Sequence, residues 1–189
     1  TFAPEAGSQR LRDIIKKDIK EEELFESINF AFSEGLSRIK LYFMLGLPFE
    51  ELSDVAAIPE VINTIIDIAH NVFTKRNFSR LMISVSINPF CPKPFTPFQW
   101  AAQNSIESFQ NKIDIIRKNI NTRFVKLNWT SPHKSSIECA LARGDSRVSD
   151  AVEIAFKKGA RFDNWSDLFD YSLWLDSFKD AKISVDFYT

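Results

Sequence analysis

Cysteine is scarce in this sequence, and its scarcity sets the first limits on the class of protein. Two of the 189 residues are cysteines, Cys91 and Cys139, and they lie far apart with no secretory leader in front of them. Small secreted domains that depend on disulfides carry more cysteines at closer spacing, so no disulfide framework is expected. Neither cysteine has a second one at a metal-binding spacing, which argues against zinc. We therefore expect a protein of a reducing, cytoplasmic compartment.

Long apolar runs and an excess of one charge are also missing. No run approaches the ~18 apolar residues that a membrane-spanning helix requires, so no span is expected. Lysine and arginine number 24 against 25 acidic residues, and no block of one sign dominates. This balance predicts no clear nucleic-acid surface and no attraction to an acidic membrane.

Aromatic residues, in contrast, are abundant. They make up 13% of the chain, with 18 phenylalanines. A disordered chain has few large apolar side chains, so this composition predicts a folded protein. At 189 residues the chain is long enough for a full core, in one or two domains.

Strands and helices alternate along the first two thirds of the chain. We expect the end of a strand at residues 1–7, strands buried on both faces at 38–45 and 80–87, and a short alternating strand at 123–129. The helices between them are predicted from apolar residues at helical spacing. They are a helix capped by Ser8, one ending near Gly35, one over residues 53–74 that Pro59 breaks or restarts, and one over 101–120.

This alternation predicts parallel strands in an α/β layer. After residue 131 the pattern changes to three helices, two of them closed by Gly144 and Gly159. We therefore place a domain boundary there, with an α/β part over 1–131 and a helical extension over 132–189.

Three consecutive strand ends carry turns that suit a ligand. "PEAGS" places a glycine and Ser8 before a helix, "MLGLPFE" has Gly46 in a turn, and "INPFCPKPFTPF" is a stiff proline-rich loop that could hold Asn88, Lys93 and Thr96 toward a pocket. Each also has a purely structural interpretation. Ser8 is then a helix cap with Gly7 for the turn, Gly46 supplies conformational freedom, and the proline-rich loop is a cover. The carboxyl ends of parallel strands share one edge, so together these turns predict a common rim.

Five ordered blocks resemble the C-terminal part of a radical SAM enzyme. They are "TFAPEAGSQRLRDIIKK", "IKLYFMLGLPFE", "ISVSINPFCPKPFTPFQW", "SSIECALARGDSRV" and "KKGARFDNW", and they span nearly the whole chain. More narrowly, they are similar to an uncharacterised subfamily that often carries an N-terminal cobalamin-binding-type domain. The resemblance implies the C-terminal half of a partial (β/α)6 TIM-like barrel, strands four to six, followed by a mainly helical appendage. It also implies S-adenosylmethionine and a 4Fe-4S cluster as cofactors that generate a 5′-deoxyadenosyl radical; the substrate and the use of cobalamin stay open.

The resemblance also implies which residues bind S-adenosylmethionine. Glu5 takes the position of a polar side chain on the ribose hydroxyls, and Lys17 that of a basic residue on the methionine carboxylate. The remaining positions are in or beside the strand-end turns. They are Ser8 before the first helix, Met44, Gly46 and Pro48 around the adenine, and Asn88 and Phe90 at the end of the sixth strand.

The chain departs from the family pattern in two places. It contains no CxxxCxxC motif, and Cys91 and Cys139 do not match one, so the ligands of a cluster would come from an upstream part of the same polypeptide. Phe49 stands where the family has a small polar residue, so the helix that follows lacks a clear cap. The alternatives are a non-catalytic α/β binding or scaffold module that has lost the cluster site, and an unrelated α/β ligand-binding domain.

Overall fold

The structure, a computed structural model, describes all 189 residues as two compact units. Unit 1 comprises Thr1–Asn88 and Glu107–Thr130, and unit 2 comprises Pro89–Ile106 and Ser131–Thr189. The proline-rich segment therefore belongs to the C-terminal unit, whereas it was expected in the α/β part, residues 1–131. The two units are described separately below.

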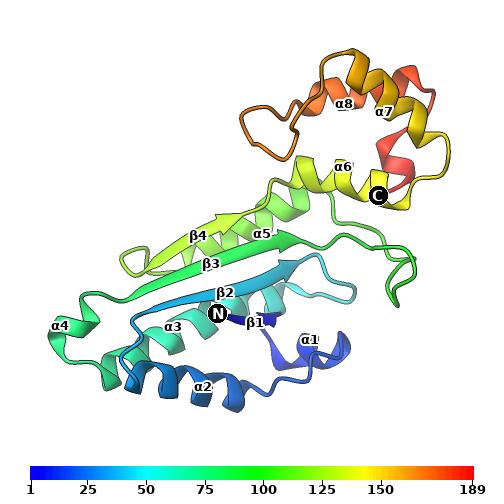
Figure 1. Cartoon of the computed structure of the whole chain (residues 1–189). Helices are drawn as coiled ribbons and strands as arrows, with labels where there is room; N and C mark the ends of the chain where they lie inside the picture. Colours follow the sequence, from blue (N-terminus) through cyan, green and yellow to red (C-terminus); the bar gives the residue numbers. More distant parts are fainter. The chain divides into compact units, whose positions relative to one another are not determined.

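Unit 1 is built on a four-stranded sheet whose spatial order follows the chain, β1-β2-β3-β4. β1 pairs with β2 and β3 with β4 in parallel, and all four arrows point the same way in Figure 1. The predicted parallel α/β layer is confirmed, and it holds one strand more than the three that the resemblance implies. The strands are β1 (Phe2–Glu5), β2 (Arg38–Leu45), β3 (Met82–Pro89) and β4 (Val125–Trp129).

The two long strands bury one face, not both as predicted. In β3, Ile83, Val85 and Ile87 are fully buried, while Ser84 and Ser86 between them are partly exposed. β2 alternates in the same way. Strands reverse their side chains at every residue, so this pattern leaves the second face of the sheet open in unit 1. Tyr42 and Met44 lie on the open face of β2 and made that run look uniformly apolar.

Helices cover the buried face of the sheet. Residues of α2, α3 and α5 join the alternate strand residues in one core cluster, and the helices lie behind the strands in Figure 1. α2 ends as predicted, with Gly35 at a φ of 86° just beyond it. The helices of unit 1 are α1 (Gln9–Ile14), α2 (Glu21–Ser33), α3 (Leu52–Val72), α4 (Lys75–Phe78) and α5 (Ile106–Lys118).

Pro59 does not break α3, contrary to the prediction. The helix runs through it, although proline removes one amide donor and crowds the carbonyl of Val55. Pro59 is itself buried, as are Val55, Ile58 and Ile62 around it. The packing of this face against the sheet stabilises the helix more than the lost hydrogen bond destabilises it. α1 is short and ends at Ile14.

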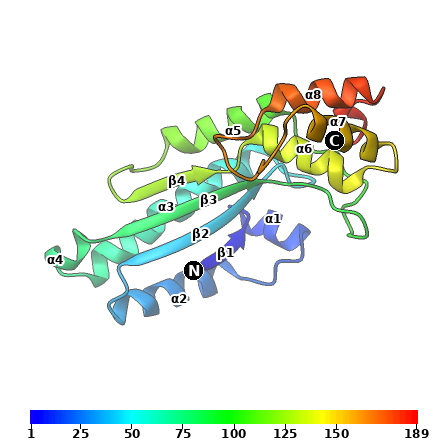
Figure 2. The ribbon, with the colours of Figure 1, turned by 45° about the horizontal axis from the view of Figure 1, so that its top comes forward.

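Unit 2 is helical, as expected for the C-terminal extension. Trp174 and Phe178 of α8 pack with Ile137 and Ala140 of α6 in a second core cluster. α8 starts at Tyr171 because the Asp170 side chain caps it. The elements are α6 (Pro132–Arg143), α7 (Val148–Lys157), α8 (Tyr171–Asp180) and the short 3₁₀ helix η1 (Val185–Phe187), and Figure 2 shows them in a second view. No helix in either unit is long and apolar enough to span a bilayer.

Candidate functional site

Glu5 and Lys17, the two residues singled out most sharply in the sequence, lie together in the structure. Lys17 Nζ is 3.5 Å from Glu5 Oε1, and the two side chains are 32% and 25% exposed. Glu5 ends β1, where the pairing with β2 shifts register and the Glu5 backbone takes a φ of 65°. A positive φ is costly for a residue with a side chain, so the protein maintains this carboxylate at an unfavourable backbone position. The pair presents one anionic and one cationic group at the carboxyl end of a strand.

A buried arginine holds the loop between β1 and α1. Arg12 is fully buried, and its Nη1 donates to the carbonyl oxygens of Ala6 and Gly7 at 3.0 and 3.2 Å. Its Nη2 is 2.9 Å from a carboxylate oxygen of Glu21. The guanidinium thus satisfies carbonyl groups that the loop would otherwise bury unpaired. This arrangement fixes the backbone that carries Glu5.

Gly7 is required for close approach, not for a special turn conformation. A Cβ atom on Gly7 would lie 2.6 Å from the carbonyl oxygen of Asp54 and 2.6 Å from the amide nitrogen of Ile58. Both are backbone atoms of α3, which cannot move aside as a flexible side chain can. The β1–α1 loop therefore rests directly on the first turns of α3.

Ser8 is confirmed as the cap of α1, and its hydroxyl also bonds to α3. Ser8 Oγ accepts the amide hydrogen of Leu11 and donates to Asp54 Oδ1 at 2.5 Å. The Arg10 guanidinium pairs with the same buried carboxylate and donates to the carbonyl of Phe49 at 2.9 Å. Asp54 therefore joins α1, the turn after β2 and the start of α3.

Asp54 also corrects the expectation that α3 lacks a clear cap. Its carboxylate accepts the amide hydrogen of Glu51 at 2.7 Å, as the third residue of a capping box. Burial opposes ionisation of this carboxyl, but hydrogen bonds from Arg10, Ser8 and the Glu51 amide outweigh it. Together they hold the pKa of Asp54 below its ordinary value.

Asp54→Asn should therefore destabilise unit 1 in a pH-dependent way. A carboxyl whose pKa is depressed by folding stabilises the protein above its unfolded pKa, and this contribution is lost as the pH falls through the folded pKa. We expect Asp54→Asn to lower the free energy of unfolding by about 2 kcal/mol at pH 7. Urea unfolding from pH 7 down to pH ~3 should show the difference from wild type shrinking below pH ~4. A constant difference over this range would contradict the role of the ionised carboxylate.

The turn after β2 is anchored by a buried ion pair that no sequence pattern predicted. Gly46, at a φ of 84°, donates its amide hydrogen to Glu50 Oε2 at 2.9 Å. The other carboxylate oxygen of Glu50 is 2.6 Å from Lys112 Nζ of α5. Gly46 thus supplies the conformational freedom that the turn requires, as its structural interpretation predicted. Its amide hydrogen is bonded to Glu50 of the same chain. Met44 and Pro48 flank this turn and are partly exposed.

The end of β3 carries Asn88, the last of the strand-end candidates that belong to unit 1. Asn88 is exposed, and its Oδ1 accepts the hydroxyl hydrogen of Thr130 at 2.7 Å. Because the four strands are parallel, their carboxyl ends, including Glu5, Met44 and Asn88, lie at the same edge of the sheet. The predicted candidate Phe90, with Lys93 and Thr96, belongs to unit 2. There Lys93 pairs with Glu138 of α6, and Thr96 donates to the Lys93 carbonyl.

Several residues that organise this site were not singled out in the sequence. Tyr42, Ser84 and Ser86 line the open sheet face, and the alternation of serine with Ile and Val in "ISVSI" was the signal for it. Asp54 had a recognisable signal in its capping-box spacing from Glu51. Lys112 had none, since its partner lies in a distant part of the sequence.

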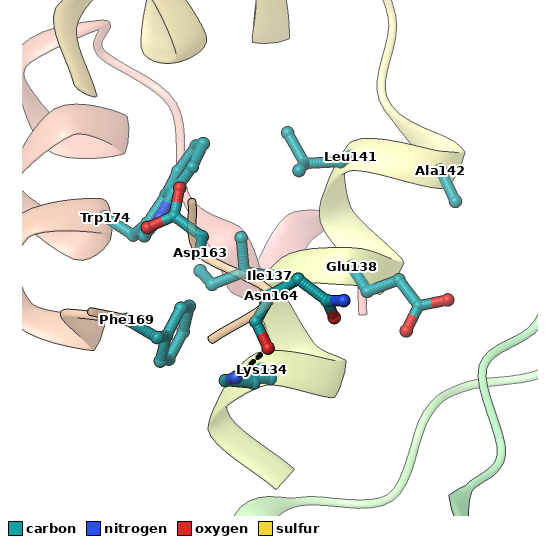
Figure 3. A pocket seen from close by; sticks show the side chains of 9 residues that line it. All are labelled: Lys134, Ile137, Glu138, Leu141, Ala142, Asp163, Asn164, Phe169 and Trp174. Carbon is teal, nitrogen blue, oxygen red and sulfur yellow. Dashed lines mark hydrogen bonds between the residues drawn. The ribbon is translucent and has the colours of Figure 1, made fainter. Parts of the chain in front are cut away.

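Unit 2 contains a cavity of about 560 Å³, none of whose lining residues was a sequence candidate. Lys134 of α6 donates to the carbonyl oxygen of Asn164 at 3.0 Å, as the dashed line in Figure 3 marks. The Trp174 ring lies on another side of the cavity, and its buried Nε1 has no hydrogen-bond partner. Apolar, acidic and basic groups are mixed around it. Its lining residues are Lys134, Ile137, Glu138, Leu141, Ala142, Asp163, Asn164, Phe169 and Trp174.

Comparison with known proteins identifies one archaeal relative. Over 150 residues the chain is 35% identical to the uncharacterized protein MJ0966 of Methanocaldococcus jannaschii. The match covers 79% of this chain and 31% of that protein, so the chain spans about a third of the length of its relative. No protein-family model matches the sequence, and no solved structure matches it.

Proposed function

We propose that this chain is the C-terminal half of a partial (β/α)6 TIM-like barrel and binds S-adenosylmethionine as part of a radical SAM enzyme. The observation that carries the proposal is the sheet of unit 1. Its strands follow each other in sequence order, its helices cover one face, and its other face is open and partly polar. Doubly wound sheets reverse their strand order and carry helices on both faces, whereas barrels keep the order and hold their helices outside. The open face then corresponds to the inside of the barrel.

The groups at the strand ends match those of S-adenosylmethionine. This ligand carries a ribose diol, a carboxylate and an ammonium group. Glu5 can accept two hydrogen bonds from a diol, and Lys17 can pair with a carboxylate. In the chain these side chains contact each other at 3.5 Å and are partly exposed, so each remains accessible to a charged ligand. The partly exposed side chain of Met44 lies at the same edge and offers an apolar surface for the adenine.

An iron–sulfur cluster fits this chain less well. Its two cysteines both belong to unit 2, and neither unit holds a cluster of metal-binding side chains. Together, a reduced cluster and S-adenosylmethionine supply a 5′-deoxyadenosyl radical when both are bound. In the proposal the cluster ligands come from residues outside this chain, and Glu5 and Lys17 hold and orient the nucleoside and amino-acid parts.

Binding of S-adenosylmethionine to the chain tests the proposal directly. Equilibrium dialysis with labelled S-adenosylmethionine should give saturable, one-to-one binding that S-adenosylhomocysteine competes for and adenine alone does not. A longer protein that contains this segment, reconstituted anaerobically with iron and sulfide, should release 5′-deoxyadenosine under reducing conditions. If the chain binds the nucleoside but the longer protein releases none, the non-catalytic binding module is the better description. Absence of binding in both would overturn the proposal.

Glu5→Gly separates a role in binding from a role in folding. Glycine suits the positive φ at this position, so we expect the free energy of unfolding to stay within about 1 kcal/mol of wild type. Loss of the carboxylate should weaken S-adenosylmethionine binding at least about tenfold, since one charge-assisted hydrogen bond contributes that much. Dialysis and urea unfolding on the same samples measure both effects.

Lys182→Gly is the matched control. Lys182 lies in unit 2 and has a φ of 59°, so this variant makes the same backbone change away from the strand ends. It should leave the affinity unchanged. Equal affinities in Glu5→Gly and wild type would show that the carboxylate takes no part in binding.

A further inference from the structure

The cavity of unit 2 has the size and the apolar lining of a small-molecule site. Its volume of about 560 Å³ lies within the range of ~300–1,000 Å³ that is typical of such sites. α6 supplies most of its wall, and the loop after α7 and the first turn of α8 supply the rest. Ile137, Leu141, Phe169 and Trp174 give it an apolar surface, as Figure 3 shows. An apolar ligand therefore fits this cavity, and the polar groups of the wall decide what else the ligand carries.

Lys134 places a cation at the cavity in a fixed position. Its Nζ donates to the carbonyl oxygen of Asn164 at 3.0 Å and to Ser166 Oγ at 3.5 Å, and it lies 5.5 Å from the centroid of the Phe169 ring. An ammonium group has three N–H donors, so one is left for an anion in the cavity. Because the side chain is already held, binding of an anion does not carry the full cost of ordering it.

Asp163 supplies a carboxylate that no group of the chain neutralises. It lines the cavity, is partly exposed and makes no hydrogen bond or ion pair. Glu138, the other acidic residue of the wall, is already paired with Lys93 at 2.5 Å. The cavity thus offers one unpaired anion and, at Lys134, one cation with a free donor. These charges favour a ligand that carries both signs.

A buried donor at the cavity wall also has no partner. Trp174 is 6% exposed, and its Nε1 has no acceptor although the side chain lines the cavity. A buried indole N–H usually has a hydrogen-bond partner, because an unpaired buried donor is costly. A ligand that brings an oxygen to this N–H removes that cost.

We propose that this cavity binds a short peptide with apolar side chains and free termini. The ammonium group of the peptide pairs with Asp163, its carboxylate accepts the free N–H of Lys134, and one of its oxygens accepts the N–H of Trp174. Its apolar side chains lie on Ile137 and Leu141. A cavity of this size encloses a drug-sized ligand, which favours a peptide over a single amino acid. The inference is independent of the proposed function, because every residue involved belongs to unit 2.

Calorimetric titration of the full chain with the dipeptide leucyl-phenylalanine tests the proposal. We expect saturable, one-to-one binding. Acetylation of the ammonium group or amidation of the carboxylate should each weaken it at least about tenfold, because each removes one charge-assisted hydrogen bond. Free leucine should bind more weakly than the dipeptide. The proposal is overturned if no dipeptide binds, if both blocked forms bind as tightly as the free one, or if free leucine binds as tightly as the dipeptide.

Asp163→Asn separates recognition from folding, because Asp163 has no partner in the chain to lose. We expect an unchanged thermal midpoint, about tenfold weaker binding of the dipeptide and no change for the acetylated dipeptide, which has no ammonium group to pair. Asp167→Asn is the matched control, since Asp167 lies in the same loop, is exposed and does not line this cavity. It should leave the affinity unchanged. Equal effects of the two variants would contradict a direct contact with Asp163.

The indole N–H resonances show where the peptide binds. The chain has four tryptophans, and Trp174→Phe identifies the resonance of Trp174 while it keeps an aromatic wall. We expect this resonance to shift most during titration of the wild-type chain, and Trp174→Phe to weaken binding of the dipeptide. A titration that shifts another indole resonance and leaves that of Trp174 in place would put the peptide elsewhere and overturn the proposal.

Discussion

Gly7→Ala should lower the free energy of unfolding of unit 1 by about 3 kcal/mol or more, because the added methyl group meets backbone on two sides. The Cβ atom would lie 2.6 Å from both the Asp54 carbonyl oxygen and the Ile58 amide nitrogen. Relief requires the β1–α1 loop to move away from α3. That movement would also weaken the contacts of Ser8 and Arg10 with Asp54. Urea unfolding measures the loss, and hydrogen exchange should show faster exchange in α1 and the first turns of α3.

Gly35→Ala is the matched control for this substitution. Gly35 has a φ of 86°, but nothing lies within 4 Å of the position of its added Cβ. Gly35→Ala should therefore lower the free energy of unfolding by only about 1 kcal/mol, the cost of placing alanine in the left-handed backbone conformation. The two variants separate lack of space from backbone conformation as the reason for a glycine. Equal losses in both would contradict the close approach of the loop to α3.

Short-range patterns in the sequence predicted most of the elements of unit 1. Apolar runs gave the positions of the strands, helical spacing gave α2 and α5, and Gly35 marked a helix end as expected. These signals depend on residues within a few positions of one another, so a single sequence contains them. The parallel arrangement followed from the alternation of strands and helices. The one-sided burial of β2 did not, because Tyr42 and Met44 are large apolar or aromatic residues on its open face.

Contacts between distant residues account for what the sequence could not predict. Pro59 was expected to break a helix because local propensity disfavours it, but packing of α3 against the sheet overrides that propensity. The proline-rich segment belongs to unit 2, where Gln103 and Lys93 bond it to α6. Neither outcome depends on nearby sequence.

The candidate site also combines residues that the sequence singled out with residues whose role depends on contacts between distant parts of the chain. Glu5 and Lys17 were identified from a family resemblance, and the structure places them in contact. The buried groups that fix their surroundings are Arg12 and Asp54. Arg12 carried no pattern that set it apart from a surface charge, and the capping-box spacing of Asp54 from Glu51 did not indicate that its carboxylate is buried. Burial is a property of the fold, so their role became visible only with the packing of α1 against α3.

Lys112→Met should destabilise unit 1 by about 3–5 kcal/mol, because it leaves the Glu50 carboxylate buried without its cation. The Glu50 and Lys112 side chains are 3% and 12% exposed, and their charged atoms are 2.6 Å apart. The remaining partner of Glu50 would be the amide hydrogen of Gly46. The turn after β2 would then lose its connection to α5, and urea unfolding should show the effect at neutral pH.

A double variant tests whether the unpaired charge is the cause. Glu50→Gln with Lys112→Met removes both charges but keeps an oxygen that can accept the Gly46 amide hydrogen, so it should recover more than half of the loss. Lys157→Met provides the comparison for an exposed pair, since Lys157 and Glu153 are 69% and 64% exposed. Its cost should be no more than about 0.5 kcal/mol, because water already solvates both charges. If the double variant is as unstable as Lys112→Met alone, the packing of the lysine side chain, rather than its charge, stabilises the turn.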